Sequence, residues 1–181
     1  MSMRTLAAVL VLSGALGLSA CVTAPSPDEV RAPAPARPVD PERFYAGRWL
    51  EIARLPMRLT DGCVAGATNY VVVSPTRVDV RDTCQVGTPQ GREKAIGGRG
   101  EILDPGVNAK LRVRYVGGLI TWDYWVLDHA EDYSWFISAD PTFDKLWIYT
   151  REVPTAAERQ ALTARAAALG YDVSRLEFPA F

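Results

Sequence analysis

Between residues 40 and 152 the chain alternates apolar and polar positions in short runs. Residues 110–115, with the sequence KLRVRY, alternate with a period of two, which is the pattern of a strand with one buried face. Residues 77–82 follow the same pattern, and turn-forming pairs such as Ser74-Pro75 and Gly117-Gly118 separate the runs. These signals predict eight strands, over residues 47–56, 64–73, 77–85, 92–103, 109–116, 122–129, 133–139 and 145–151.

Successive short strands joined by tight turns favour an up-and-down antiparallel sheet, and eight of them can close into a barrel without exposed edges. One helix follows, because Thr155 and Glu158 have the spacing of a capping box and Gly170 marks a C-terminal stop. The predicted fold class is all-β: an eight-stranded antiparallel up-and-down barrel with one C-terminal α-helix packed on its wall. The helix would contact the wall through an apolar stripe of Leu162, Ala166 and Leu169.

The alternation also assigns side chains to the barrel interior. With Trp49 pointing inward, Glu51 and Ala53 also point inward. Glycine inside a strand marks the close approach of a ligand or backbone, or a sharp bend. An eight-stranded barrel is either filled by its own side chains or holds one small ligand. The candidate ligand-binding positions are Glu51, Tyr70, Val80, Gly98, Leu111, Val113, Tyr115, Tyr124, Val126, Trp147 and Tyr149.

Composition and charge exclude several function classes. The 181 residues carry a formal net charge of −1 without a basic or acidic block, so we expect no nucleic-acid partner. His129 is the only histidine, which excludes a histidine-rich metal site and leaves no legible Ser-His-Asp arrangement. We expect this histidine on the surface, at a strand end near a turn. No cofactor, no metal and no enzymatic activity are therefore predicted.

The N-terminal residues indicate a targeting signal. Residues 1–20 contain a basic residue and then an apolar core too short to span a bilayer. The sequence LSAC that ends at Cys21 resembles the lipobox of bacterial lipoproteins, which implies cleavage before Cys21 and its acylation. Val22 in place of aspartate at the next position favours the outer membrane, on its periplasmic face. The alternative is an ordinary secretory peptide followed by a chance cysteine.

Residues 21–39 follow as a tether rich in proline and alanine. Such a segment has too few large apolar side chains to fold by itself, so we expect an extended spacer between the membrane and a folded domain over residues 40–181.

Three ordered motifs carry a family resemblance. Residues 47–54, GRWLEIAR, residues 122–128, WDYWVLD, and residues 146–151, LWIYTR, resemble the three conserved motifs of lipocalins, and ALGYD at 168–172 is similar to bacterial members. The resemblance covers about residues 40–176. It implies that Trp49 plugs one end of the barrel, that Arg151 lies across its ring, and that Gly47 allows a tight bend beside them.

Cys63 and Cys84 lie at the start of the second predicted strand and at the end of the third. The hairpin at residues 74–77 brings those ends together, and a secreted protein enters an oxidising compartment, so we expect a disulfide. The alternative is a catalytic thiol, as in the prostaglandin synthases of the lipocalin family.

The resemblance implies a lipid or other small apolar ligand, with fatty acid or lysophospholipid as the expected class. Glu51 would then be a partner for the ligand, a partner for a nearby arginine, or a structural carboxylate. Two alternatives remain open: a scaffold lipoprotein with a filled barrel, and a lipocalin-type enzyme. Homodimers occur in the family, but no surface pattern in this sequence indicates one.

Overall fold

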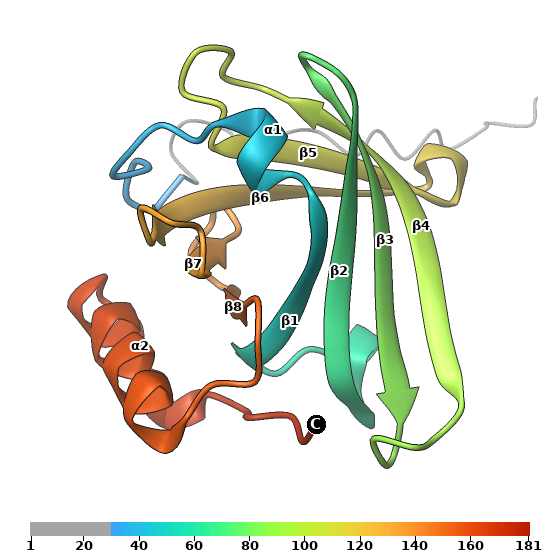
Figure 1. Ribbon diagram of the computed structural model, residues 1–181, viewed down its shortest axis with the longest axis vertical. Helices are drawn as coiled ribbons and strands as arrows, with labels where there is room; N and C mark the ends of the chain where they lie inside the picture. The colour runs from blue at the N-terminus through green and yellow to red at the C-terminus, as the bar shows by residue number, and fades with distance from the viewer. Residues whose placement is uncertain (1–29) are drawn as a thin grey trace, which may run out of the picture.

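The computed structural model describes residues 30–181, so the predicted signal segment and Cys21 lie outside the described residues (Figure 1). Eight antiparallel strands form a closed barrel in which each strand pairs with the next and β8 pairs with β1. The predicted fold class is confirmed, and every strand end lies within two residues of its predicted position. The strands are β1 (Gly47–Arg54), β2 (Cys63–Ser74), β3 (Arg77–Val86), β4 (Glu93–Ile102), β5 (Lys110–Tyr115), β6 (Ile120–His129), β7 (Trp135–Ala139) and β8 (Leu146–Thr150).

Because successive strands run in opposite directions, their connections alternate between the two ends of the barrel. We call the end that carries the connections 55–62, 87–92, 116–119 and 140–145 the open end. The opposite end, here called the closed end, is covered by the short helix α1 (Pro41–Phe44), seen at the top of Figure 1. Asp40 caps this helix by accepting hydrogen bonds from the backbone amides of Glu42 and Arg43.

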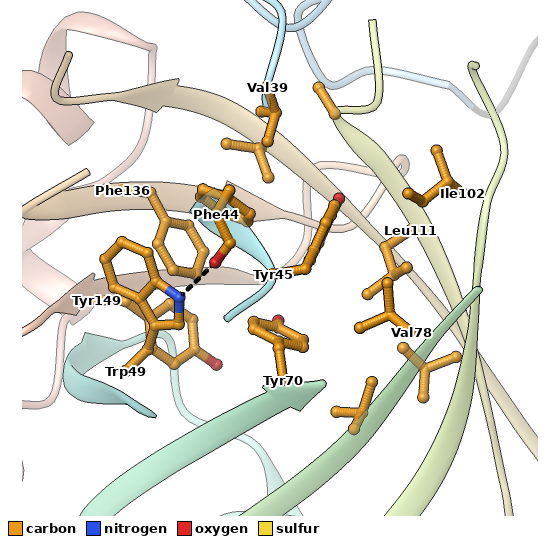
Figure 2. Close-up of a cluster of buried hydrophobic side chains, with 14 of the residues drawn as sticks. Val39, Phe44, Tyr45, Trp49, Tyr70, Val78, Ile102, Leu111, Phe136 and Tyr149 are labelled. Carbon is orange, nitrogen blue, oxygen red and sulfur yellow. Dashed lines mark hydrogen bonds between the residues drawn. The ribbon is translucent and has the colours of Figure 1, made fainter. Parts of the chain in front are cut away.

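A cluster of aromatic side chains fills the closed end (Figure 2). Trp49 is fully buried, and its indole Nε1 donates a hydrogen bond to the carbonyl oxygen of Phe44 at 3.1 Å. The guanidinium of Arg151 lies 3.5 Å from the centre of the Trp49 ring and donates to the carbonyl oxygens of Ala46 and Arg48. Strands β1 and β8 are thereby joined at the plugged end of the barrel.

A second apolar cluster lies outside the barrel, between its wall and the helix α2 (Ala156–Ala168). Figure 1 shows this helix beside β1, β7 and β8. Thr155 and Glu158 form the predicted capping box. Leu162 and Ala166 are the buried residues of the helix, and they pack against outward side chains such as Ile148. The predicted packing of the helix on the wall is confirmed.

The inward orientation predicted for Ala53 is wrong. The pairing of β1 with β8 shifts between Glu51 and Ala53, which is a β-bulge. A bulge adds one residue to one strand and reverses the alternation beyond it. As a result, Ala53 packs in the outer cluster, whereas Arg54 points into the barrel beside Glu51.

The prediction that the tether stays unfolded up to the barrel is wrong for residues 30–39, which pack against the barrel wall. The backbone amides of Ala32, Ala36 and Val39 donate to carbonyl oxygens of the barrel domain, and Ala32 and Val39 are buried. Arg37 also pairs with Asp128 at 2.9 Å. Composition alone misses this packing because the barrel, and not the segment, supplies most of the apolar surface.

The predicted surface position of His129 is also wrong, since only 4% of this residue is exposed. Its ring lies 5.0 Å from the ring of Tyr133, measured between centroids. Nδ1 is 2.8 Å from the carbonyl oxygen of Ala130, and Nε2 is 3.2 Å from that of Pro38. His129 therefore fastens the segment 30–39 to the barrel.

Candidate functional site

The barrel encloses a cavity of about 240 Å³ that is reached from the open end. Its walls come from β1 to β6 and β8, and the connection 55–62 contributes Met57, Leu59 and Thr60 at the entrance. Eight of the predicted interior residues line it: Glu51, Tyr70, Val80, Val113, Tyr115, Tyr124, Trp147 and Tyr149.

Three predicted lining residues lie elsewhere. Leu111 and Val126 are buried in the packed closed end, so the barrel is filled at their level. Gly98 is covered by β5: a Cβ atom at this position would lie 2.5 Å from Cγ1 of Val113 and 2.8 Å from Cδ1 of Tyr115. Because Gly98 has no side chain, the side chains of Val113 and Tyr115 can pack against its backbone. Gly98 is therefore a packing position and not a ligand contact, which corrects the prediction.

The Tyr115 ring crosses β4 at Gly98 and reaches Asp82 on β3. Its hydroxyl donates to Oδ2 of Asp82 at 2.6 Å, and the Thr68 hydroxyl donates to Oδ1 at 2.6 Å. The hydroxyls of Tyr115 and Tyr124 are 3.0 Å apart, which extends the network to β6. Burial raises the pKa of Asp82 above its ordinary value, although the two donated hydrogen bonds oppose the shift.

Asp82 is not among the predicted site residues, although the alternation along β3 could have identified it. Val80 is among the predicted interior positions, and the same alternation places residue 82 on that face. The hydrogen-bond network shows that Asp82 is an acceptor in the cavity wall.

Glu51 and Arg54 form an ion pair inside the barrel, with 2.7 Å between Oε1 and Nη1. Arg54 also donates to Glu177 and to the carbonyl oxygens of Thr60 and Cys63. Burial raises the pKa of Glu51, and the charge of Arg54 opposes that shift. Most donors of Arg54 are thus engaged by the protein, so this guanidinium holds the connection 55–62 and the C-terminal segment in place.

The remaining wall is apolar and aromatic. The rings of Trp122, Tyr124 and Trp147 form a cluster with centroids 5.1 to 6.3 Å apart. The side chains of Tyr70 and Tyr149 also line the cavity. Burial raises the pKa of both tyrosines, so the hydroxyls stay protonated and can donate to a ligand.

The predicted disulfide between Cys63 and Cys84 is confirmed, and it lies in the cavity wall at the open end. Neither sulfur is a free nucleophile, which removes the catalytic-thiol alternative for these two residues. Lys94 is the β4 residue that pairs with Cys84, and its Nζ donates to the carbonyl oxygen of Leu59 at 3.0 Å, which holds the connection 55–62 across the entrance.

Residues 30–181 bring together no group of three or more His, Cys, Asp or Glu side chains that could hold a metal ion. In the same part of the chain, no helix has the length and hydropathy of a membrane span.

Comparisons with known proteins agree with this geometry. The family profile of the lipocalin-like domain matches residues 39–180. The chain is 32% identical to temperature-induced lipocalin-1 of Arabidopsis thaliana over 142 residues, which cover 73% of this chain and 74% of that protein. It is 30% identical to a lipocalin-like protein of Acanthamoeba polyphaga mimivirus, covering 73% of this chain and 79% of that one. Among solved structures it is similar to insecticyanin from Manduca sexta, with a TM-score of 0.64, 20% identity, and coverage of 83% and 86%.

Proposed function

This chain belongs to the lipocalin family, and from that premise we propose that it is a membrane-anchored carrier of a single-chain lipid, a fatty acid or a lysophospholipid, in the bacterial cell envelope. The observation that supports the proposal is a cavity that is open at one end, plugged at the other, and walled mainly by apolar and aromatic side chains.

The size and energetics of the cavity favour one acyl chain. Sites for drug-sized ligands have about 300–1,000 Å³, so a cavity of about 240 Å³ suits one chain better than a two-chain lipid. Burial of each methylene contributes about 0.8 kcal/mol, against an association cost of about 4–15 kcal/mol. About a dozen buried methylenes contribute roughly 10 kcal/mol, which exceeds the association cost over the lower half of that range.

The charges favour insertion of the chain before the head group. The interior holds two carboxyl groups, Glu51 and Asp82, and its arginine, Arg54, is already paired with Glu51. Among residues 30–181, the interior offers an anionic head group no cation without a carboxylate partner, so the head group would be repelled there. Lys94 stands at the entrance, where a head group can meet both its charge and water.

The membrane anchor in this proposal comes from Cys21, which lies outside the described residues. Two or three acyl chains on one cysteine bind a membrane far more firmly than a single chain does. The test is the intact mass of the mature protein from the membrane fraction. We expect an acylated species that begins at Cys21, and a Cys21→Ala variant that leaves the membrane fraction. An unmodified mass would overturn the anchor.

Ligand binding is tested by native mass spectrometry of the purified chain and by titration with palmitate and lysophosphatidylcholine. Trp122 and Trp147 line the cavity and supply the fluorescence signal. We expect Val80→Phe, which fills the cavity, to weaken binding at least about tenfold. The matched control is Val71→Phe, because Val71 points to solvent with 62% exposed.

Two outcomes would contradict the carrier function. One is the absence of both a co-purifying lipid and a titratable response, which would favour a scaffold lipoprotein. The other is an equal loss of affinity in the Val80 and Val71 variants, which would show that the lipid binds outside the barrel.

A further inference from the structure

The segment 30–39 runs along the barrel wall from the open end to the closed end. The amides of Arg31 and Ala32 donate to the carbonyl oxygen of Pro141, in the open-end connection between β7 and β8, at 2.8 and 3.0 Å. Arg31 also pairs with Asp144 in the same connection. At the other end of the segment, the amide of Val39 donates to Val107, in a closed-end connection. The described chain therefore begins beside the open end.

This route limits which end of the barrel can approach an anchored Cys21. Eight residues lie between Cys21 and Val30, and the nine steps along the chain reach at most about 30 Å when fully extended. The segment from 31 to 39 bends at residues 32, 36 and 37, so it covers less of the wall than the roughly 26 Å that eight extended steps of about 3.3 Å would span. The open end can thus contact the membrane with length to spare, whereas contact by the closed end would use a large part of the reach.

The open end carries exposed apolar side chains, which we call the apolar rim: Leu59, Val86, Val116 and Leu119, with exposed fractions of 44%, 41%, 55% and 78%. Leu59 also lines the cavity entrance, so the rim is continuous with the site. The turn that carries Val116 and Leu119 projects at the right of Figure 1, away from α1.

The backbone of that turn is itself unusual. Val116 has a φ of 49°, in the left-handed region that a β-branched residue rarely adopts. Strained residues of this kind cluster at functional sites, because the surrounding structure must hold them. Here the strained turn presents two apolar side chains to solvent.

Charges beside the rim suit an anionic lipid surface. Arg58, Arg92 and Lys94 are exposed in or next to the open-end connections. Of the neighbouring acids, Glu93 is paired with Arg81 at 2.6 Å and Asp144 with Arg31 at 2.7 Å, whereas Asp61 is exposed in the connection 55–62. Clustered basic residues near a membrane surface are attracted by anionic lipids.

We infer that the open end of the barrel docks on the bilayer that holds the anchor, with the apolar rim inserted among the lipid head groups. The cavity then opens directly at the membrane, and a lipid enters or leaves without crossing bulk water. This orientation rests on the anchor in the proposed function.

The test places an environment-sensitive fluorophore at Leu119→Cys in the acylated protein, bound to vesicles of phosphatidylethanolamine and phosphatidylglycerol. The matched control carries the same fluorophore at Val71→Cys, an exposed site on β2 toward the closed end. We expect a blue shift and strong quenching by spin-labelled lipids at position 119, and neither at position 71. Equal responses, or quenching at 71 alone, would overturn the orientation.

A second measurement follows lipid transfer from the anchored protein to its vesicle. We expect Leu119→Asp to slow transfer about tenfold and Val71→Asp to leave it unchanged, with lysophospholipid affinity in solution preserved in both. Equal transfer rates would contradict docking through the rim. The intact mass of the same samples separates the two claims: a missing acyl group overturns the anchor, whereas an acylated protein with an unquenched position 119 overturns only the docking.

Discussion

The substitution Gly98→Ala probes how the cavity wall is built. Gly98 lies on β4 beneath side chains of β5, and a Cβ there would lie 2.5 Å from Cγ1 of Val113 and 2.8 Å from Cδ1 of Tyr115. Ordinary carbon contacts need about 3.5–4.0 Å, so both side chains must move by about 1 Å. The Tyr115 hydroxyl, which donates to Asp82 at 2.6 Å, would be carried away from its acceptor.

Two effects of Gly98→Ala lower the free energy of unfolding. Overpacking of this kind costs about 1–3 kcal/mol, and loss of a hydrogen bond to a charged group costs about 1.5–3 kcal/mol. Alanine is itself better than glycine inside a strand by about 0.5–1 kcal/mol, which offsets a small part. We therefore expect the free energy of unfolding to fall by about 2–5 kcal/mol, and the melting temperature by roughly 5–15 °C for a domain of this size.

The adjacent residue provides a matched control. Gly97 is exposed on the outer face of β4, and the nearest atom to a Cβ there is the carbonyl oxygen of Val80 at 3.9 Å. Gly97→Ala should therefore be neutral or slightly stabilising. Urea unfolding of both variants, with Tyr115→Phe added to form a double-mutant cycle, measures the difference. If Gly98→Ala unfolded at the same denaturant concentration as Gly97→Ala, the close approach of Tyr115 to β4 would be refuted.

Three further predictions concern the ends and the interior of the barrel. Trp49→Ala should lower the free energy of unfolding by about 3–5 kcal/mol, because it empties the closed end, and an unchanged thermal melt would contradict that role. Replacing both Cys63 and Cys84 by alanine should cost about 3 kcal/mol in guanidinium unfolding, since the bond closes a loop of 21 residues; reduction of the wild type should give the same loss. Burial raises the pKa of Asp82, so the folded state holds the proton more tightly than the unfolded state does, and wild-type stability should fall as pH rises from about 4 through the raised value. Asp82→Asn removes that titration, so its stability relative to wild type should rise between pH 4 and 7; a constant difference would show that Asp82 titrates normally.

The alternation of residues predicted the strands and most inward positions because a barrel wall has one wet and one dry face. It failed where the backbone breaks the period. The bulge at Glu51 to Ala53 turns Ala53 outward and Arg54 inward, and nothing in the sequence GRWLEIAR marks it. Of the roles predicted for Glu51, that of a partner for a nearby arginine is confirmed, but simple alternation places Arg54 on the outer face and therefore does not identify it as that arginine.

Other misses have a different origin, because they depend on contacts between distant parts of the chain. His129 is buried by the segment 30–39, which composition alone predicts to be unfolded. Leu111 and Val126 face the interior, as alternation requires, but α1 and the aromatic cluster fill the barrel at their level. A period of two shows which side chains point into the barrel. It does not show how far the cavity extends from the open end before packed side chains fill the barrel.

The depth of the cavity and its charges together constrain how a lipid can bind. The inner end of the cavity is formed by the aromatic cluster around Trp49 and Phe44. The carboxyl groups of Glu51 and Asp82 lie in the cavity walls, between that cluster and the entrance at the open end. Because Arg54 is already neutralised by Glu51, a negative head group gains nothing by descending past these residues. A lipid that enters tail first leaves its head group beside Lys94, at the end where the apolar rim lies. The charge distribution inside the barrel and the rim outside it thus favour the same arrangement, in which the head group stays at the membrane interface while the chain is transferred.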